Sequence, residues 1–255
     1  NGAGDLAADW ARTLERLTTR TDLWQLTVRP WAQGLPAWGL LRPAPAWCSV
    51  CYHDWRERGQ VAYQPVVWML QEMSVCVAHG TRLRERCPSC GQCQSPIAAR
   101  TGPGCCTQCN SRLDAPLEEA EPETDNEMRA WQEWVVDTVE ELRQAGVARG
   151  PLPWDHLPDG IAACIGVRGS ARELSRRVQA SKQLFLGWCH RTRRPSFVYL
   201  LRTCYALGLS PLQLMSTGGQ EVPAALVSGQ SRQVPLPRRT GPPPADTARL
   251  EAFLQ

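Results

Sequence analysis

Four short stretches of the sequence decide the fold: WCSVC at 47–51, CVAHG at 76–80, CPSCG at 87–91 and CTQC at 106–109. Each stretch carries two metal-binding side chains separated by two residues. A turn of this kind brings its two ligands to about 4 Å from each other, so two such turns can complete a tetrahedral site. The pattern therefore predicts two metal sites within one segment of the chain.

The first predicted site combines two pairs that are separated by 24 residues. Its ligands are Cys48, Cys51, Cys76 and His79. The alternative is a surface histidine with three packing cysteines, but two pairs with matching spacing favour zinc. His53 is a weaker candidate for the histidine ligand because it follows Cys51 by only two residues.

The second predicted site has 15 residues between its pairs, which is the spacing of a zinc ribbon. Its ligands are Cys87, Cys90, Cys106 and Cys109. Gly91 can relieve backbone strain directly after the second cysteine. Cys105 is an alternative to Cys106, but Cys106 keeps the two-residue spacing, and Cys93 is then left over.

Both predicted sites close with four protein ligands. A catalytic zinc usually has three protein ligands and keeps a position for water. The deaminase signature H-x-E with P-C-x-x-C is absent, and a redox C-x-x-C would need a thioredoxin-like context. We therefore expect two structural Zn²⁺ ions and no enzyme activity. A zinc enzyme with an open coordination position remains an alternative.

Length and cysteine usage indicate the compartment. The chain has 255 residues with 12 cysteines, which is long for a disulfide scaffold, and most of the cysteines stand in metal-type pairs. No signal-peptide pattern opens the sequence, and no run of about 18 apolar residues predicts a membrane span. We expect a cytoplasmic bacterial protein. Because the chain begins at Asn1, we also expect it to be part of a longer product.

The charge is unevenly distributed along the chain. After residue 164 there are 13 Lys or Arg against 4 Asp or Glu, although the net charge of the whole chain is only +3. A basic C-terminal half suits nucleic acid. The alternative is a solvated arginine-rich surface in a protein whose abundant Ala, Gly, Pro and Arg reflect codon bias.

Helical periodicity dominates the rest of the sequence. Leu6, Trp10, Leu14 and Leu17 predict a helix over 5–20, and a short helix is expected over 63–73. The acidic stretch 116–124 is predicted to be a solvated linker. Met128, Trp131, Val135, Val139 and Leu142 predict an amphipathic helix that Gly146 can end.

The predicted fold is mainly α, with two small zinc-ribbon or knuckle modules and a C-terminal helix-turn-helix bundle. Five segments are expected: a helical and irregular segment 1–46, a tandem zinc region 47–113, an acidic linker and amphipathic helix 114–160, a helical bundle 161–217 and a Pro/Arg-rich tail 218–255. The tail has too few apolar residues to fold by itself.

Within the helical bundle, the order helix, tight turn, helix, basic corner, helix is that of a repressor-type helix-turn-helix. Gln179 stands in the turn where glycine is usual. The residues expected to contact DNA are Ser181, Lys182 and Gln183 at the start of the second helix and Arg191, Arg193 and Arg194 at the corner. The alternative is a bundle that packs or docks a protein partner.

Several motifs resemble the TniQ family. They are Leu41-Arg-Pro, Trp47-Cys-x-x-Cys51, Trp55-Arg56, Pro65 with Trp68, Cys76-x-x-His79-Gly80, Leu83, and Cys87-Pro-x-Cys90-Gly91. Residues 17–31 are similar to the family's upstream region, and Arg193-Arg-Pro195 with 207–212 resembles its CRISPR-associated members. The resemblance covers roughly residues 10–110 and, less closely, 170–215.

The resemblance implies a non-catalytic target-selection protein of the TniQ and TnsD kind. Such proteins bind target DNA or a CRISPR effector complex with its guide RNA, and they recruit the transposon's AAA+ ATPase. It also implies zinc at the eight ligands named above. A zinc-containing transcription regulator that reads an operator directly is the alternative. The sequence leaves open the route of targeting and the oligomeric state, a homodimer included.

Overall fold

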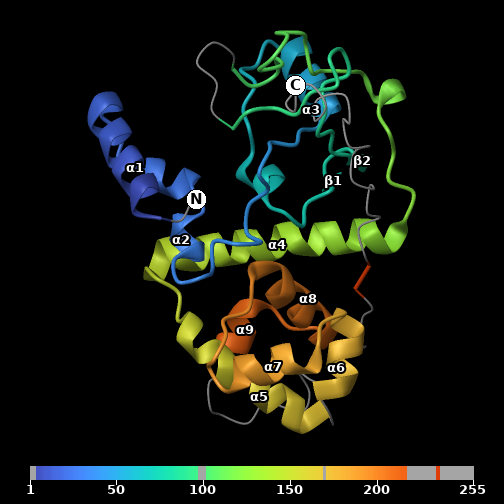
Figure 1. Cartoon of the computed structure of the whole chain (residues 1–255). Coiled ribbons are helices and arrows are strands. Elements are labelled where there is room, and N and C mark those ends of the chain that lie inside the picture. Colours follow the sequence, from blue (N-terminus) through green and yellow to red (C-terminus); the bar gives the residue numbers. More distant parts are fainter. Residues whose placement is uncertain (1–3, 97–101, 169–170, 217–233, 236–255) are drawn as a thin grey trace, which may run out of the picture.

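Helix α4 (Asn126–Arg149) runs between two packed regions of the molecule (Figure 1). The computed structural model describes residues 4–96, 102–168, 171–216 and 234–235. On one side of α4 lie the cysteine-rich loops with helix α3 and strands β1 and β2. On the other side lie helices α5 to α9. The predicted mainly helical fold is confirmed, with few strands among the described residues.

The sequence around α4 explains its start and its buried face. The side chain of Asp125 caps the helix by accepting hydrogen bonds from the backbone N–H groups of Glu127 and Met128, at 2.9 and 3.2 Å. All five predicted apolar positions are buried, which confirms the amphipathic helix. The helix ends at Gly150, whose φ of 83° is accessible to glycine at little cost.

Gly146 lies inside α4, so the prediction that it ends the helix is wrong. A Cβ atom at this position would lie 1.9 Å from the carbonyl oxygen of Pro30, in helix α2 (Arg29–Ala32). The missing side chain lets the backbone of α2 approach α4 closely. A sequence gives no sign of such a contact, because Pro30 is far away along the chain.

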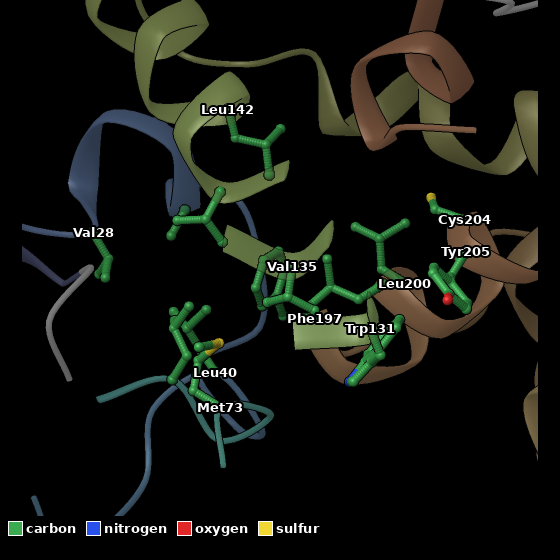
Figure 2. Close-up of a cluster of buried hydrophobic side chains, with 14 of the residues drawn as sticks. Val28, Leu40, Met73, Trp131, Val135, Leu142, Phe197, Leu200, Cys204 and Tyr205 are labelled. Carbon is green, nitrogen blue, oxygen red and sulfur yellow. The ribbon is translucent and has the colours of Figure 1, made fainter. Parts of the chain in front are cut away.

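Helix α4 buries residues toward both regions, and Figure 2 shows the resulting cluster. Trp131 packs edge-on against Tyr205 of helix α8 (Phe197–Leu207), with ring centroids 4.9 Å apart. Leu40 and Met73, from the cysteine-rich region, belong to the same buried cluster. The two regions therefore share one hydrophobic core through α4.

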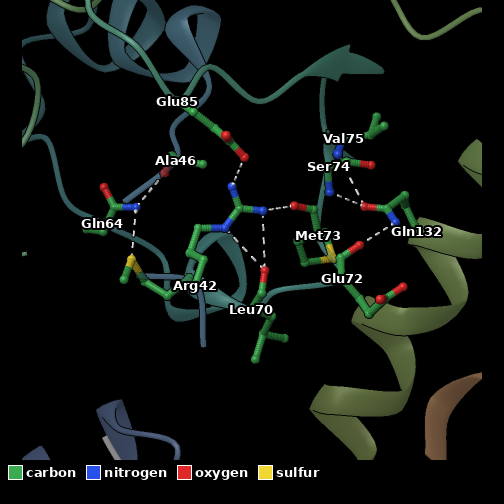
Figure 3. Close-up of polar contacts among 11 residues, drawn as sticks. Arg42, Ala46, Gln64, Leu70, Glu72, Met73, Ser74, Val75, Glu85 and Gln132 are labelled. Atoms are coloured by element: carbon green, nitrogen blue, oxygen red, sulfur yellow. Dashed lines mark hydrogen bonds and ion pairs between the residues drawn. The ribbon is translucent and has the colours of Figure 1, made fainter. Parts of the chain in front are cut away.

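Polar contacts fix the cysteine-rich region on α4 (Figure 3). The Oε1 atom of buried Gln132 accepts hydrogen bonds from the backbone N–H groups of Ser74 and Val75, at 2.7 and 3.2 Å. Its Nε2 donates to the carbonyl oxygen of Glu72 at 2.9 Å. One glutamine thus satisfies three backbone groups of the segment that leads into β1.

A buried ion pair joins the cysteine-rich region to the helical bundle. Arg202 of α8 lies 2.9 Å from Glu72, and both side chains are largely buried. Burial raises the pKa of Glu72, while Arg202 opposes that shift. Such a pair is costly to break, since either partner alone would leave a buried charge without compensation.

The cysteine-rich region contains little regular secondary structure. Its elements are α3 (Ser49–Glu57), η2 (Val66–Met69), β1 (Val75–Cys76), β2 (Thr81–Arg82) and η3 (Leu117–Glu119). β1 and β2 pair antiparallel, with Val75 opposite Arg82. The helix predicted over 63–73 is wrong, because only η2 forms there. The next residue, Leu70, is extended and bridges to Leu41.

The acidic stretch 116–124 before α4 is mostly exposed, as predicted for a solvated linker, but Glu121 and Glu123 also pair with β2 and the turn before it. The carbonyl oxygen of Glu121 accepts from the Arg82 N–H at 2.8 Å, and the N–H of Glu123 donates to the Gly80 carbonyl at 2.8 Å. The Arg82 side chain also pairs with both carboxylates, each at 3.2 Å. The charges of this stretch are thus partly neutralised within the fold.

The predicted bundle of short helices is confirmed. It consists of η4 (Trp154–His156), α5 (Leu157–Arg168), α6 (Ala171–Val178), α7 (Lys182–Cys189), α8 and α9 (Pro211–Ser216). Gly208 ends α8 with a φ of 71°, as predicted. Gln179 joins α6 to α7 with a φ of 55°, a left-handed conformation that costs a non-glycine residue about 1–2 kcal/mol.

At the N-terminal end the described residues form a helix, and two residues of the predicted C-terminal tail are buried. The predicted N-terminal helix is confirmed as α1 (Asp5–Thr18), which contacts η1 (Leu23–Leu26). Of the predicted tail, 218–233 and 236–255 lie outside the described residues, whereas Val234 and Pro235 are buried. Among the described helices, none is long and apolar enough to cross a membrane.

A substitution at Gly146 tests the close approach of α2. Gly146→Ala should destabilise the protein by about 1–3 kcal/mol, because the new methyl group meets backbone atoms that cannot move alone. In an exposed helix the same change stabilises a protein by about 1 kcal/mol, so a loss of stability would indicate the close contact with α2. The measurement is urea unfolding of the metal-loaded protein.

Gly187→Ala is the matched control, since Gly187 lies inside α7. The atoms nearest to a Cβ there would be side-chain atoms of Arg193 and Thr192, at 3.4 Å or more. This variant should be neutral or slightly stabilised. Equal stability of the Gly146→Ala and Gly187→Ala variants would contradict the proposed packing of α2 on α4.

Candidate metal centres

The first cluster brings together Cys48, Cys51, Cys76 and His79, with all ligand atoms within 4.8 Å of one another. The sulfur atoms of Cys51 and Cys76 are 3.7 Å apart. The Nδ1 atom of His79 lies 3.6, 3.2 and 3.7 Å from the three sulfurs. Zinc–sulfur bonds of about 2.3 Å require tetrahedral edges of about 3.8 Å, so the cluster can hold a metal ion of this kind.

His79 is held by a carboxylate that the sequence did not single out. Its Nε2 atom lies 3.3 Å from Oδ2 of Asp54 in α3. A metal-bound histidine commonly donates its second N–H to such a group, which fixes the ring and the tautomer. Asp54 therefore orients His79 so that Nδ1 faces the three sulfurs. The spacing of Asp54 from Cys51 gives no local signal for this role.

The second cluster brings together Cys87, Cys90, Cys106 and Cys109, again within 4.8 Å. The sulfurs of Cys87 and Cys109 are 3.7 Å apart, as are those of Cys90 and Cys106. The side-chain amide of Gln94 lies 3.5 Å from the sulfur of buried Cys106. These distances fit one tetrahedral metal ion. Gln94 is a second supporting residue that the sequence did not reveal.

Three of the four ligand turns share one backbone geometry. The residue after the second ligand has a left-handed φ: 63° at Gly80, 69° at Gly91 and 60° at Asn110. Its N–H donates to the carbonyl oxygen of the first ligand, at 2.7, 2.8 and 3.0 Å respectively. Glycine suits this conformation, and asparagine tolerates it better than most residues.

The fourth turn instead starts a helix. Cys48 is the N-cap of α3, and its sulfur accepts a hydrogen bond from the backbone N–H of Cys51 at 3.4 Å. The Thr81 hydroxyl lies 3.5 Å from the same sulfur. The positive end of the helix dipole and these donors favour a thiolate at Cys48.

The thiols of each cluster influence one another's ionisation. Hydrogen bonds from Cys51 and Cys76 hold the pKa of Cys48 well below its ordinary value, while the contact with Cys48 raises the pKa of Cys76 to about 11. In the second cluster, burial opposes ionisation of Cys106, but backbone N–H groups lower its pKa to about 6. Hydrogen bonds with Ser111 also lower the pKa of Cys109. Each cluster thus favours the thiolate form, which binds metal.

The remaining candidate ligands stay outside the clusters. Cys105 and Cys93 are not among the grouped side chains, and Cys93 is exposed. His53 lies 3.8 Å from Asp114 and faces Arg56 rather than the sulfurs. The two-residue spacing therefore selects the same ligands that the structure brings together.

Some of the residues expected to contact DNA are exposed, whereas others are paired within the fold. Ser181 caps α7 by accepting from the N–H of Leu184 at 3.3 Å, and Lys182 and Gln183 are exposed beside it. Arg191 is engaged elsewhere, because its guanidinium donates to both oxygens of Asp159, at 3.0 and 2.8 Å.

Of the other two arginines, Arg194 is engaged within the fold and Arg193 has no ion pair among the described residues. Arg194 donates to the Gly34 carbonyl at 3.0 Å and lies 3.5 Å from Asp155. The guanidinium of Arg193 has no ion pair within the described part of the chain. The sequence could not predict these pairings, since the aspartates lie in η4 and α5, more than 30 residues earlier.

Comparisons with known proteins leave the site to be interpreted from its own geometry. A scan of the chain against protein-family models matches none, and a search of curated proteins finds no matching sequence.

Metal content tests the composition of the clusters. Cys76→Ser should lower the zinc bound per chain from two ions to one, because three ligands hold a structural zinc much less tightly than four. A structural zinc contributes on the order of 10 kcal/mol to folding, so the variant should also melt at a lower temperature. Elemental mass spectrometry and circular dichroism provide the two readouts.

Cys93→Ser is the matched control, since Cys93 is an exposed cysteine of the same region outside both clusters. It should retain two zinc ions and the parent melting temperature. Retention of two ions by Cys76→Ser, or loss of one by Cys93→Ser, would refute the ligand assignment.

Proposed function

We propose that the chain binds two structural zinc ions and acts as a non-catalytic adaptor that selects target sites in DNA transposition. In this role it links target DNA, or an RNA-guided effector complex, to the AAA+ ATPase that recruits the transposase. The proposed setting is the reducing cytoplasm of a bacterium. The resemblance to the TniQ family supplies the biological role, and the geometry of the metal centres supplies the non-catalytic character.

The closed form of both clusters is the observation that carries the proposal. Each cluster offers four protein ligands, which fill the corners of a tetrahedron. No corner is left for a water or a substrate, as zinc hydrolysis would need. Cys48 and Cys106 are also fully buried. Such zinc ions organise loops, and organised loops present surfaces to partners.

Other motif residues of the TniQ resemblance have structural roles in this region. The indole N–H of buried Trp47 donates to the Leu113 carbonyl at 3.1 Å, which ties the first ligand turn to the end of the second module. Trp68 is buried and stacks against Trp55, with the ring centroids 5.9 Å apart. The resemblance thus includes one residue that joins the two modules and two that pack within the first.

A direct DNA-binding role is the second candidate, and one surface favours it. We interpret α6, the turn at Gln179 and α7 as a helix-turn-helix, with α7 as the reading helix. Lys182 and Gln183 are exposed at its N-terminal end, and Arg193 is free within the described residues. Leu186 is also exposed on α7, which suits contact with a protein or a base methyl group better than with phosphate.

Reconstitution distinguishes the two candidates. The purified chain should form a stable complex with the AAA+ ATPase, or with the effector complex encoded beside it, and should show no tight operator of its own. Size-exclusion chromatography of the mixed components, with and without target DNA, measures this. Nanomolar binding of the isolated chain to one DNA site, without any complex, would favour the regulator.

The double substitution Lys182→Ala with Arg193→Ala tests whether this corner contacts DNA or a protein partner. Under the adaptor proposal it should keep the protein complex and lose only salt-sensitive DNA affinity, by roughly tenfold. Loss of the complex together with an unchanged zinc content would contradict a purely DNA-facing role for this corner.

A further inference from the structure

Helix α1 exposes a row of large apolar side chains. Leu6 is 70% exposed, Trp10 61%, Leu14 44% and Leu17 76%. At 100° per residue, these four positions fall on one stripe of the helix. Helices usually turn such a stripe toward a core, so an uncovered stripe marks an interaction surface.

The attachment of α1 fixes which side is exposed. Ala11 is its one buried residue, and Glu15 on the same side accepts a hydrogen bond from the Trp24 N–H at 3.2 Å. The Gly4 carbonyl accepts from Arg29 at 2.8 Å. Figure 1 shows α1 projecting away from the body of the molecule. These contacts turn the Ala11 side inward and leave the apolar stripe accessible.

We propose that α1 pairs antiparallel with α1 of a second copy of this chain. The spacing of the stripe is nearly symmetric under such a reversal. The midpoint between Leu6 and Leu17 falls about half a residue from the midpoint between Trp10 and Leu14. A twofold axis near residue 12 therefore sets Leu6 against Leu17 and Trp10 against Leu14, in both directions.

The charges beside the stripe select the antiparallel orientation. Asp9 and Arg16 are both exposed and lie seven residues apart, on the same flank of the stripe. In the antiparallel pair, Asp9 of each copy lies level with Arg16 of the other, so that Asp9, which already pairs with Arg12 of its own helix, gains a second opposite charge in each copy. A parallel pair would separate these charges along the axis by about 10 Å and would set Trp10 against Trp10.

The area is sufficient for a specific contact between two copies. The four side chains are between 44% and 76% exposed in one copy, and burying them completely in both copies removes roughly 1,000 Å² from solvent, the lower bound for a specific interface. An interface of this size gives a reversible dimer. The dimer is independent of the zinc sites and of the proposed target selection, and it would present two copies of the adaptor surface.

Sedimentation velocity of the zinc-loaded full chain, from about 1 to about 100 µM, tests the proposal. The parent chain should shift from monomer to dimer as its concentration rises. Leu17→Glu should remain monomeric over this range, because it places a charge in the apolar seam. Val61→Glu is the control, since Val61 is 87% exposed but lies outside α1, and it should dimerise like the parent. Zinc content and helical circular dichroism establish that each variant is folded.

Charge reversal tests the orientation. Asp9→Arg alone and Arg16→Asp alone should each weaken the dimer by about tenfold, because each sets like charges together twice. The two reversals combined in one chain restore both opposite-charge pairs and should restore the parent dissociation constant. A parent chain that stays monomeric would overturn the proposal, as would a dimer unaffected by Leu17→Glu. A double variant no tighter than the single ones would overturn the antiparallel arrangement.

Discussion

The closure of two four-ligand clusters is the constraint on which the cysteine-rich region depends. In the described residues between Leu40 and Glu123, the chain has one α-helix of nine residues, the short 3-10 helices η2 and η3, two strands of two residues and isolated bridges. So few backbone hydrogen bonds cannot offset the conformational entropy of the ordered loops. A metal ion bound at each cluster would supply the missing free energy, because it would link turns that are distant along the chain.

Helix α4 connects this region to the rest of the molecule. Gln132 holds the backbone before β1, Trp131 packs on α8, and Gly146 admits α2 at close range. The ion pair between Glu72 and Arg202 joins the two regions beside the helix. The shape of the metal region is thereby coupled to the position of the helical bundle, and a partner on either region contacts one continuous body.

Local patterns in the sequence predicted what depends on local geometry. The two-residue spacing gave the ligands, and the three-to-four spacing gave α1 and α4. The roles of Asp54 and Gly146 and the pairing of Arg191 with Asp159 depend on contacts between distant segments, which no local pattern contains. The helix expected over 63–73 failed for a similar reason, since Leu70 pairs with Leu41 instead. Periodicity located the α1 stripe but not its exposure, which depends on how η1 holds the helix.

Amide hydrogen exchange before and after removal of metal tests the central claim most directly. The N–H groups of Gly80, Gly91 and Asn110 each bond to the carbonyl of the first ligand in their turn. The account predicts that these amides are protected in the zinc-loaded chain and lose protection when a chelator removes the metal, whereas the α8 amides keep more of theirs. Unchanged protection at all three amides after complete metal removal would contradict it.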